Sequence, residues 1–176
     1  MRLAVVMLAT IITGVLFLAY AANANDDNGP YIAASFGVNQ YNDPNASVEI
    51  TTSKYIIGAN LNDFFSAELF YGSGINNGQL NGSEISLDSY YGFKTFLFLP
   101  VGQLKPYVSA GYTQMEVSVS HPDTGSNSDS ASDTSLGLGL LAEINQHIDV
   151  RLEYTRVLDA SDYDVTEYAA TLLFKF

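Results

Sequence analysis

Hydrophobic and polar residues alternate with a period of two along most of the chain after residue 25, and the segments of alternation are separated by Asn, Asp, Gly and Pro. Between Tyr168 and Phe176, for example, every even-numbered residue is apolar, whereas Thr171 and Lys175 place polar groups on the opposite face. This period indicates β-strands, because successive side chains of a strand point to opposite faces. The pattern therefore predicts an all-β protein.

Eight segments carry the alternation. We predict strands at residues 30–41, 48–61, 64–73, 84–98, 105–119, 134–144, 148–158 and 163–176. The connections between them alternate in length: short turns around 62–63, 100–104 and 145–147, and longer polar loops at 42–47, 74–83, 120–133 and 159–162. An even number of antiparallel strands, with short turns at one end and long loops at the other, is typical of a transmembrane barrel. We therefore predict an eight-stranded antiparallel up-and-down transmembrane β-barrel.

The face that points into the barrel is indicated by glycine. Alternation alone would also fit a soluble barrel of the lipocalin kind, in which the apolar face is inside. Glycines on an outer surface weaken strands, whereas inside a narrow barrel they make room for long side chains from neighbouring strands. The polar face carries these glycines together with charged residues: Gly58, Gly92, Gly111, Gly137 and Gly139 share it with Glu68, Lys94, Glu143, Arg151, Glu153 and Lys175. We therefore place the charged face inside and the apolar face against lipid.

The six charged residues are predicted to form an ion-pair network that fills the barrel, since buried charges must be paired. A narrow or gated ion path is the alternative interpretation. The aromatic residues are expected to form two belts at the membrane surfaces. The first belt would lie near the short turns (Tyr31, Phe65, Phe174 and Phe176) and the second near the long loops (Tyr41, Tyr71 and Tyr112).

The first 24 residues have the features of a secretory signal peptide. Arg2 precedes an apolar run from Leu3 to Ala19, and Ala22-Asn23-Ala24 provides a cleavage site. A retained anchor is the alternative, although the run is shorter than the ~20 residues that span a bilayer comfortably. We therefore predict a signal peptide at 1–24 and a barrel domain at 25–176.

Composition narrows the range of functions. The chain has 7 basic and 19 acidic residues, a balance that argues against nucleic-acid partners, which require clustered Lys and Arg. It has no cysteine, so disulfides, zinc–thiolate sites and attachment of lipid to an N-terminal Cys are excluded.

The chain resembles the small eight-stranded outer-membrane barrels of the OmpA transmembrane domain and OmpX-like type, within the porin-family barrels. The resemblance rests on the order and spacing of several segments: Ala22-Asn23-Ala24, residues 61–69 and 99–107, Arg151-Leu152-Glu153-Tyr154 and the terminal Phe176. It implies an integral protein of the Gram-negative outer membrane, in contact with its lipid. It also implies that the terminal aromatics, Phe174 and Phe176, form part of the signal read by the barrel-assembly machinery.

Candidate chemistry is sparse. Lipid hydrolysis would require His beside Ser and a carboxylate, but His147 falls in a short turn, and His121, near Ser120 and Asp123, falls in a polar loop. The Asp- and Ser-rich segment His121–Asp133 contains oxygen ligands suited to calcium, but not with EF-hand spacing. We expect no enzyme activity, no cofactor and no metal site.

The sequence thus favours a monomeric structural or surface-interaction protein that acts through the loops at 42–47, 74–83, 120–133 and 159–162, because scaffolds hold function in their connections. A narrow, porin-like channel is the alternative, and a lipid-modifying enzyme is a less favoured one. The ligand cannot be named from the sequence.

Overall fold

The structure is a computed structural model that describes residues 28–43, 46–80, 83–121, 125–160 and 163–176. The predicted signal peptide, residues 1–24, lies outside the described residues. In the part of the chain that is described, no helix is long and apolar enough to cross a membrane.

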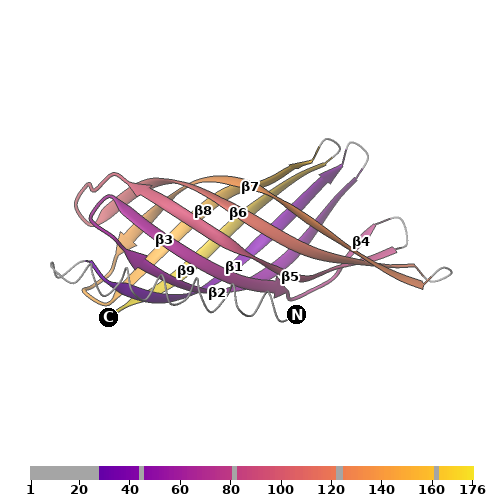
Figure 1. The fold of residues 1–176 in the computed structure, drawn as a ribbon, viewed down its shortest axis with the longest axis horizontal. Helices are drawn as coiled ribbons and strands as arrows, with labels where there is room; N and C mark the ends of the chain where they lie inside the picture. Colours follow the sequence, from indigo (N-terminus) through magenta and orange to yellow (C-terminus); the bar gives the residue numbers. More distant parts are fainter. Residues whose placement is uncertain (1–27, 44–45, 81–82, 122–124, 161–162) are drawn as a thin grey trace, which may run out of the picture.

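Strands account for nearly all of the described chain (Figure 1). They are β1 (Pro30–Asp43), β2 (Ala46–Asn60), β3 (Phe65–Gly74), β4 (Gly78–Leu80), β5 (Ser83–Phe98), β6 (Leu104–His121), β7 (Gly125–Glu143), β8 (Ile148–Ala160) and β9 (Tyr163–Lys175). Each long strand pairs antiparallel with its neighbours in sequence, so the topology is up-and-down.

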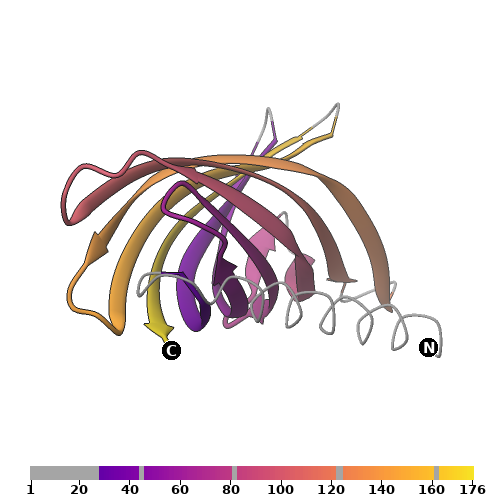
Figure 2. The same ribbon diagram turned by 60° about the vertical axis from the view of Figure 1, so that its left-hand side comes forward.

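The sheet closes on itself. β1 pairs with β9, with Ile32 opposite Phe174, and β3 pairs with β5, with Glu68 opposite Lys94. The short β4 is paired to the outer end of β5 and lies outside this ring. The predicted eight-stranded antiparallel barrel is confirmed, and the turned view in Figure 2 shows its strands curving around a common axis. Closure matters because an unpaired strand edge in hydrocarbon would leave backbone groups without hydrogen bonds.

The short turns contain residues that stabilise tight turns of the backbone. In the β2–β3 turn the side-chain Oδ1 of Asn62 accepts hydrogen bonds from the amides of Phe64 and Phe65, and Asn145 accepts from His147 and Ile148 in the β7–β8 turn. Gly102, in the β5–β6 turn, adopts a φ of 67°, which favours glycine. These local bonds join successive strands at the end of the barrel where the chain terminates.

The long polar loops were the main error of the sequence-based prediction. Residues 120–133 were predicted to be a loop, but β6 extends to His121 and β7 begins at Gly125, and the two remain paired throughout. Strands also occupy most of 42–47, β8 extends to Ala160 and β9 begins at Tyr163, and β4 lies within 74–83. The Ser- and Asp-rich segment of β7 has low strand propensity, but it pairs with Met115, Val117 and Val119 of β6, and this pairing outweighs propensity.

The outer ends of the strands separate into two groups. Pairing between β7 and β8 ends at Ser135 and Val157, although both strands continue. The β6–β7 hairpin lies apart from the ends of β8, β9 and β1 in both views, whereas β4 remains against β2, where Gly78 lies beside Val48 (Figures 1 and 2). Between them the barrel interior is apolar, with Ile50, Leu87, Met115, Val157 and Val165 all buried.

The two faces of the barrel wall are as predicted. Leu136 and Leu152 on the outer face are 68% and 57% exposed, whereas Arg151, next to Leu152, is 1% exposed. The interior glycines make room for long side chains: a Cβ at Gly111 would lie 2.8 Å from Cγ of Lys94, and one at Gly58 would clash with the ring of Tyr31. The room needed by these side chains explains why glycine recurs on the charged face.

The aromatic belts were predicted correctly only in part. Phe65, Phe174, Phe176, Tyr71 and Tyr112 are exposed on the outer face. Tyr31, however, points into the barrel, because Gly58 lies directly opposite it and leaves space for the ring. Tyr41 also points inward, where its hydroxyl donates to the sulfur of Met115.

Candidate functional site

The interior contains the densest group of charges, and its centre is the pair formed by Arg151 on β8 and Glu68 on β3. Nη1 and Nη2 of Arg151 donate to the two carboxylate oxygens of Glu68 at 2.6 and 2.9 Å, a bidentate geometry. The hydroxyl of Tyr31 donates to the same carboxylate at 2.7 Å. The guanidinium lies 4.4 Å from the ring centroid of Phe96, so its face is also covered.

A second buried pair joins Lys94 on β5 to Glu153 on β8. Nζ of Lys94 lies 2.9 Å from Oε1 of Glu153 and 3.0 Å from the hydroxyl oxygen of Thr155. The hydroxyl of Ser109 donates to the same carboxylate oxygen. Because Nε of Arg151 lies 3.9 Å from Oε2 of Glu153, the first two pairs form one connected network.

A third buried pair joins Lys54 on β2 to Glu167 on β9. Nζ of Lys54 lies 2.7 Å from Oε2 of Glu167, and the hydroxyl of Tyr90 donates to the other carboxylate oxygen at 3.3 Å. The ammonium group also lies 5.7 Å from the ring centroids of both Phe70 and Tyr90.

The remaining charges lie at the mouth beside the short turns and, except for the buried Asp149, are more exposed. Lys105 contacts Glu143 at 2.6 Å, and Lys175 contacts Asp149 at 3.0 Å and Glu143 at 3.9 Å. The structure thus places all six residues proposed from the sequence on the interior side of the wall, with four deep in the barrel and Glu143 and Lys175 at its mouth.

Sequence reasoning missed Lys54, Asp149 and Glu167 as members of this set. Each shares strand parity with an interior residue of its own strand: Lys54 with Gly58, Asp149 with Arg151, and Glu167 with Lys175. Within the barrel body the three cations Lys54, Lys94 and Arg151 match the three carboxylates Glu68, Glu153 and Glu167. The network is therefore charge-balanced, as buried ions require.

The interior is filled by side chains. The largest of those almost completely shielded from solvent include Arg151, Tyr31, Tyr90, Phe96, Ile50 and Met115. They come from both the ionic part and the apolar outer part of the barrel. Filling of this kind is expected of eight strands, whose interior is just wide enough for side chains.

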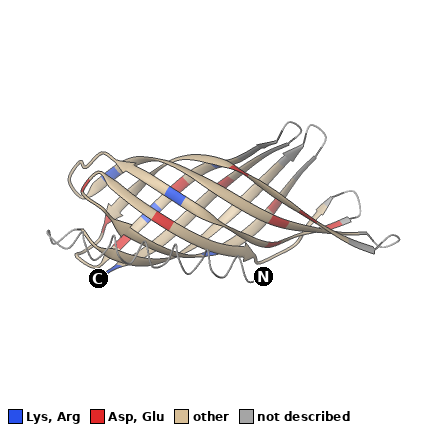
Figure 3. Cartoon of the chain, viewed as in Figure 1, with Lys and Arg blue, Asp and Glu red and all other residues tan. Residues whose placement is uncertain are grey.

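The strand ends beyond the barrel present polar and acidic groups. On β5 and β6, Asp88 accepts hydrogen bonds from the hydroxyls of Ser86 and Ser118, and Ser118 contacts Ser128 on β7 at 2.9 Å. The chain has no Lys or Arg between Lys105 and Arg151, a segment that contains the whole projecting part of the β6–β7 hairpin. In Figure 3 acidic residues reach the far strand ends, whereas the basic residues in view lie toward the short-turn end and centre.

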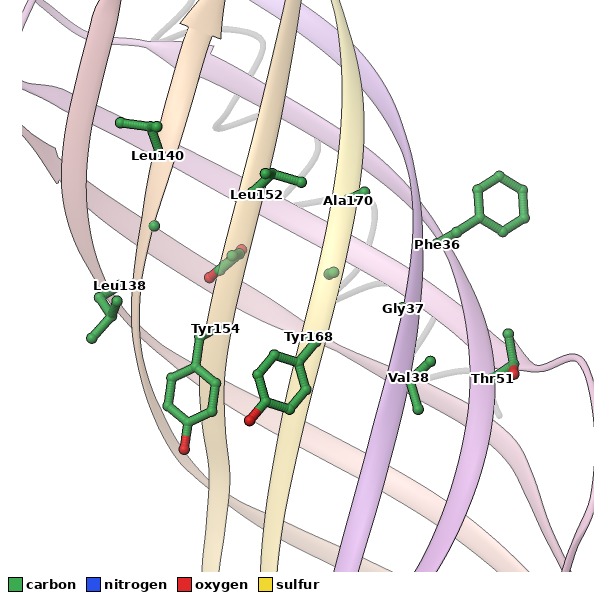
Figure 4. A pocket seen from close by; sticks show the side chains of 13 residues that line it. Phe36, Gly37, Val38, Thr51, Leu138, Leu140, Leu152, Tyr154, Tyr168 and Ala170 are labelled. Atoms are coloured by element: carbon green, nitrogen blue, oxygen red, sulfur yellow. The ribbon is translucent and has the colours of Figure 1, made fainter.

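A shallow groove of about 760 Å³ lies on the outer wall across β7, β8, β9 and β1 (Figure 4). Its floor is the small side chain of Ala170, and Phe36, Leu138 and Leu152 stand around it. The rings of Tyr154 and Tyr168 pack together with centroids 5.1 Å apart. The lining residues include neither His nor Ser.

Of the two histidines, only His147 has a described side chain. His147 is exposed in the β7–β8 turn, where its backbone amide donates to Asn145. The side chain of His121 and residue Asp123 lie outside the described residues. Among the residues that the structure does describe, no group of His, Asp and Glu is arranged to hold a metal ion.

A closed barrel with a charged interior and an apolar exterior defines an integral membrane protein of the outer-membrane type. Residues 9–176 match the family described as "Outer membrane protein beta-barrel domain". The chain belongs to this family, and it is an integral protein of the outer membrane.

Solved structures show the same fold. Neisserial surface protein A (NspA) superposes with a TM-score of 0.66 at 15% identity, covering 84% of this chain and 97% of that one. Ail, the attachment invasion locus protein of Yersinia pestis, in complex with the heparin analogue sucrose octasulfate, superposes with a TM-score of 0.66 at 11% identity. The superposition covers 85% of this chain and 99% of Ail. The N-terminal barrel of Pseudomonas aeruginosa OprF superposes with a TM-score of 0.56 at 14% identity, covering 82% of this chain and 97% of that one. No curated protein sequence shows significant similarity to the chain.

The terminal strand allows the proposed assembly signal to be tested. Phe174 and Phe176 are 41% and 77% exposed on the outer face, and the amide of Phe176 donates to the carbonyl of Pro30. If the terminal aromatic is the assembly signal, deleting Phe176 is expected to slow insertion in cells but not refolding in detergent, where no assembly machinery is present. Pulse-chase measurement of folded barrel in outer-membrane fractions tests this, with Phe64→Ala, in a turn, as control. Equal insertion rates for the deletion and the wild type would remove Phe176 from the assembly signal.

Proposed function

We propose that the protein is a non-enzymatic surface-interaction module, in which the barrel is an anchor and the projecting hairpins contact partners outside the cell. The β6–β7 hairpin carries the proposal. β6 has 18 residues and β7 has 19, whereas a transmembrane strand needs only ~9–11. Much of this hairpin therefore stands clear of the bilayer, and its described side chains are mainly polar or acidic.

The charge of the hairpin restricts the class of partner. Exposed Glu116 and Asp129, with no basic residue on either strand beyond Lys105, would repel polyanions such as heparin-like chains or nucleic acid. Ail superposes well on this chain and was solved with a sulfated ligand, so the shared fold does not dictate the partner. We propose that the partner surface is basic.

The channel alternative is less well supported by the described residues. Buried Arg151, Tyr90, Ile50 and Met115 fill successive parts of the interior, so ions would have to displace side chains at several levels. The paired ions stabilise the anchor.

Shortening the hairpin tests the proposal. Because Val117 pairs with Asp129, replacing Ser118 to Ser128 by an Asn-Gly turn should retain the register of the rest of β6 and β7. We expect this variant, in nanodiscs of zwitterionic lipid, to lose most of its binding to an immobilised basic protein such as lysozyme. Surface plasmon resonance measures the loss.

The matched control shortens another hairpin. Tyr41 pairs with Val48, so replacing Asn42 to Ser47 by Asn-Gly should leave the β6–β7 hairpin untouched and binding largely intact. A gel shift on heating should persist in both variants. Undiminished lysozyme binding by the β6–β7 variant, or stronger binding of the wild type to heparin than to lysozyme, would overturn the proposal.

A further inference from the structure

Three polar side chains in the middle of the barrel are buried without a hydrogen-bond partner. Asn39 on β1, Thr113 on β6 and Ser135 on β7 are 0%, 1% and 2% exposed. Neither Nδ2 nor Oδ1 of Asn39 has a partner among the described residues, and the same holds for the two hydroxyls. Buried polar groups are nearly always paired with protein or with ordered water, because an unpaired one is destabilising.

The three side chains face one space from different walls of the barrel. β1 and β6 are separated by three strands in either direction around the ring, so Asn39 and Thr113 lie on opposite walls. Their common level is marked by Tyr41 and Met115, each two residues further outward on the same face, whose hydroxyl and sulfur lie 4.0 Å apart. Ser135 on the adjacent β7 is the diagonal neighbour of Thr113.

The layer outward from this level is apolar. Ile50, Met115, Val157 and Val165 are buried there and pack into one hydrophobic cluster. Hydrocarbon side chains neither donate nor accept hydrogen bonds. Partners for the three polar groups must therefore come from the space between the walls or from the layer beneath.

The layer beneath contains the Lys54–Glu167 ion pair. Glu167 is the register partner of Asn39, but its carboxylate accepts from Lys54 and from the hydroxyl of Tyr90. The ammonium of Lys54 has three donors, and the hydrogen bond to Glu167 takes one of them. This layer therefore adds donors that point into the same space without satisfying Asn39 directly.

The chemistry of the site favours a small neutral molecule that both donates and accepts. An amide and two hydroxyls offer donors and acceptors together. Because the cations and carboxylates of the barrel body balance, an added ion would be an uncompensated buried charge. The short side chains of Thr113 and Ser135, with Gly92 opposite Thr113, cannot span an eight-stranded interior. Water has the size and the hydrogen-bonding capacity that this space requires.

We propose that a small cluster of structural water molecules binds inside the barrel, held by Asn39, Thr113 and Ser135 and by the ammonium of Lys54. The cluster connects β1, β2, β6 and β7 across the interior and solvates the Lys54–Glu167 pair from its outer side. The interior then has three parts: an apolar outer cap, this hydrated layer and the ionic body. The inference does not depend on which partner the hairpins contact.

Nuclear magnetic resonance of the full chain in detergent micelles tests for the water directly. The side-chain amide protons of Asn39 should show nuclear Overhauser effects to water, although the residue is fully buried. The double variant Thr113→Val with Ser135→Ala leaves Asn39 in place but removes two of the groups that hold the cluster, so these effects should weaken severalfold. No contact between the Asn39 amide and water in the wild type would overturn the proposal.

Unfolding in urea gives an independent test, because the two interpretations predict opposite signs. If the hydroxyl of Thr113 binds water, Thr113→Val should shift the folding equilibrium about fivefold toward the unfolded chain. If the site is dry, valine removes an unpaired hydroxyl and should stabilise the barrel. A folded Thr113→Val protein that is as stable as the wild type, or more stable, would therefore overturn the proposal.

A double-mutant cycle tests whether the two walls share the cluster. Asn39 and Thr113 have no direct hydrogen bond, so Asn39→Leu and Thr113→Val should be non-additive only if water links them. Additive effects would contradict a shared cluster. Replacing Na⁺ by choline at constant ionic strength should leave the urea midpoint unchanged, and a stabilisation by Na⁺ that Thr113→Val abolishes would show an ion site in place of water.

Discussion

Replacing Arg151 by Met is expected to lower the free energy of unfolding by ~3–5 kcal/mol, because it removes one partner of a buried ion pair. The carboxylate of Glu68, which is 3% exposed, would lose two hydrogen bonds from the guanidinium and keep the one from the hydroxyl of Tyr31. The unbranched methionine side chain fills much of the space of the arginine stem. The expected loss of stability therefore reflects the uncompensated charge of Glu68 more than a cavity. Urea unfolding in detergent micelles, followed by far-UV circular dichroism because the chain has no tryptophan, measures the change.

A second substitution separates charge from packing. Glu68→Gln combined with Arg151→Met removes both charges, and the double variant should recover a large part of the loss, since apolar or neutral replacement of a whole buried pair is often tolerated. Equal instability of the single and double variants would show that Arg151 stabilises the barrel by filling space and covering Phe96. A single variant as stable as the wild type would contradict the ion-pair account.

Replacing Leu152 by Arg is expected to destabilise the inserted barrel by ~2–4 kcal/mol if the residue lies near the bilayer midplane. Leu152 is 57% exposed on the outer wall, beside Ala170 and Leu140, so an arginine there would face lipid. Reversible unfolding from lipid vesicles measures the cost. Leu99→Arg is the matched control, since Leu99 is similarly exposed but lies in the β5–β6 connection, where the cost should be close to zero.

The pair of arginine variants tests which face of the wall meets lipid. A Leu152→Arg protein as stable as Leu99→Arg in vesicles would mean that the outer wall at Leu152 is in contact with water. The assignment of the charged face to the interior would then have to be reversed.

Strand parity made most of the fold predictable. At positions 58, 92, 111, 137 and 139 neighbouring atoms leave no room for a Cβ, so these glycines belong on the crowded interior face. Once they identify the interior face of a strand, alternation assigns every other residue of that strand to one face or the other. Tyr31 was misplaced although Gly37, on the same strand and the same face, marks that face as interior. Its direction depends on Gly58, which becomes its neighbour only when β1 and β2 pair in the observed register.

The partners within the ion-pair network could not be predicted from the sequence. Glu68 and Lys94 lie directly opposite each other on β3 and β5, so their cross-strand position alone would predict an ion pair between them. Glu68 instead binds Arg151, and Lys94 binds Glu153, both on β8 across the interior. These choices depend on the closure and stagger of the whole ring, which alternation does not specify.

The projecting hairpin was missed for a different reason. The segment from Ser126 to Asp133 is composed of residues that favour turns and loops, so composition predicted a loop. Its pairing depends on the long, strand-forming partner in β6, which the composition of the segment alone does not reveal. The segment lies where the sequence predicted a loop, but its strand pairing became visible only in the structure.

Conductance of the purified protein in planar bilayers is the most direct test of the claim that the barrel is a filled anchor and that its hairpins carry the function. With Arg151, Tyr90, Ile50 and Met115 filling the interior, the wild type should show no steady ion current above that of the protein-free bilayer. The hairpin-shortened variant should be equally silent. A steady, single-sized conductance of the wild type that changes ion selectivity in Arg151→Met would contradict the account and make the protein a channel.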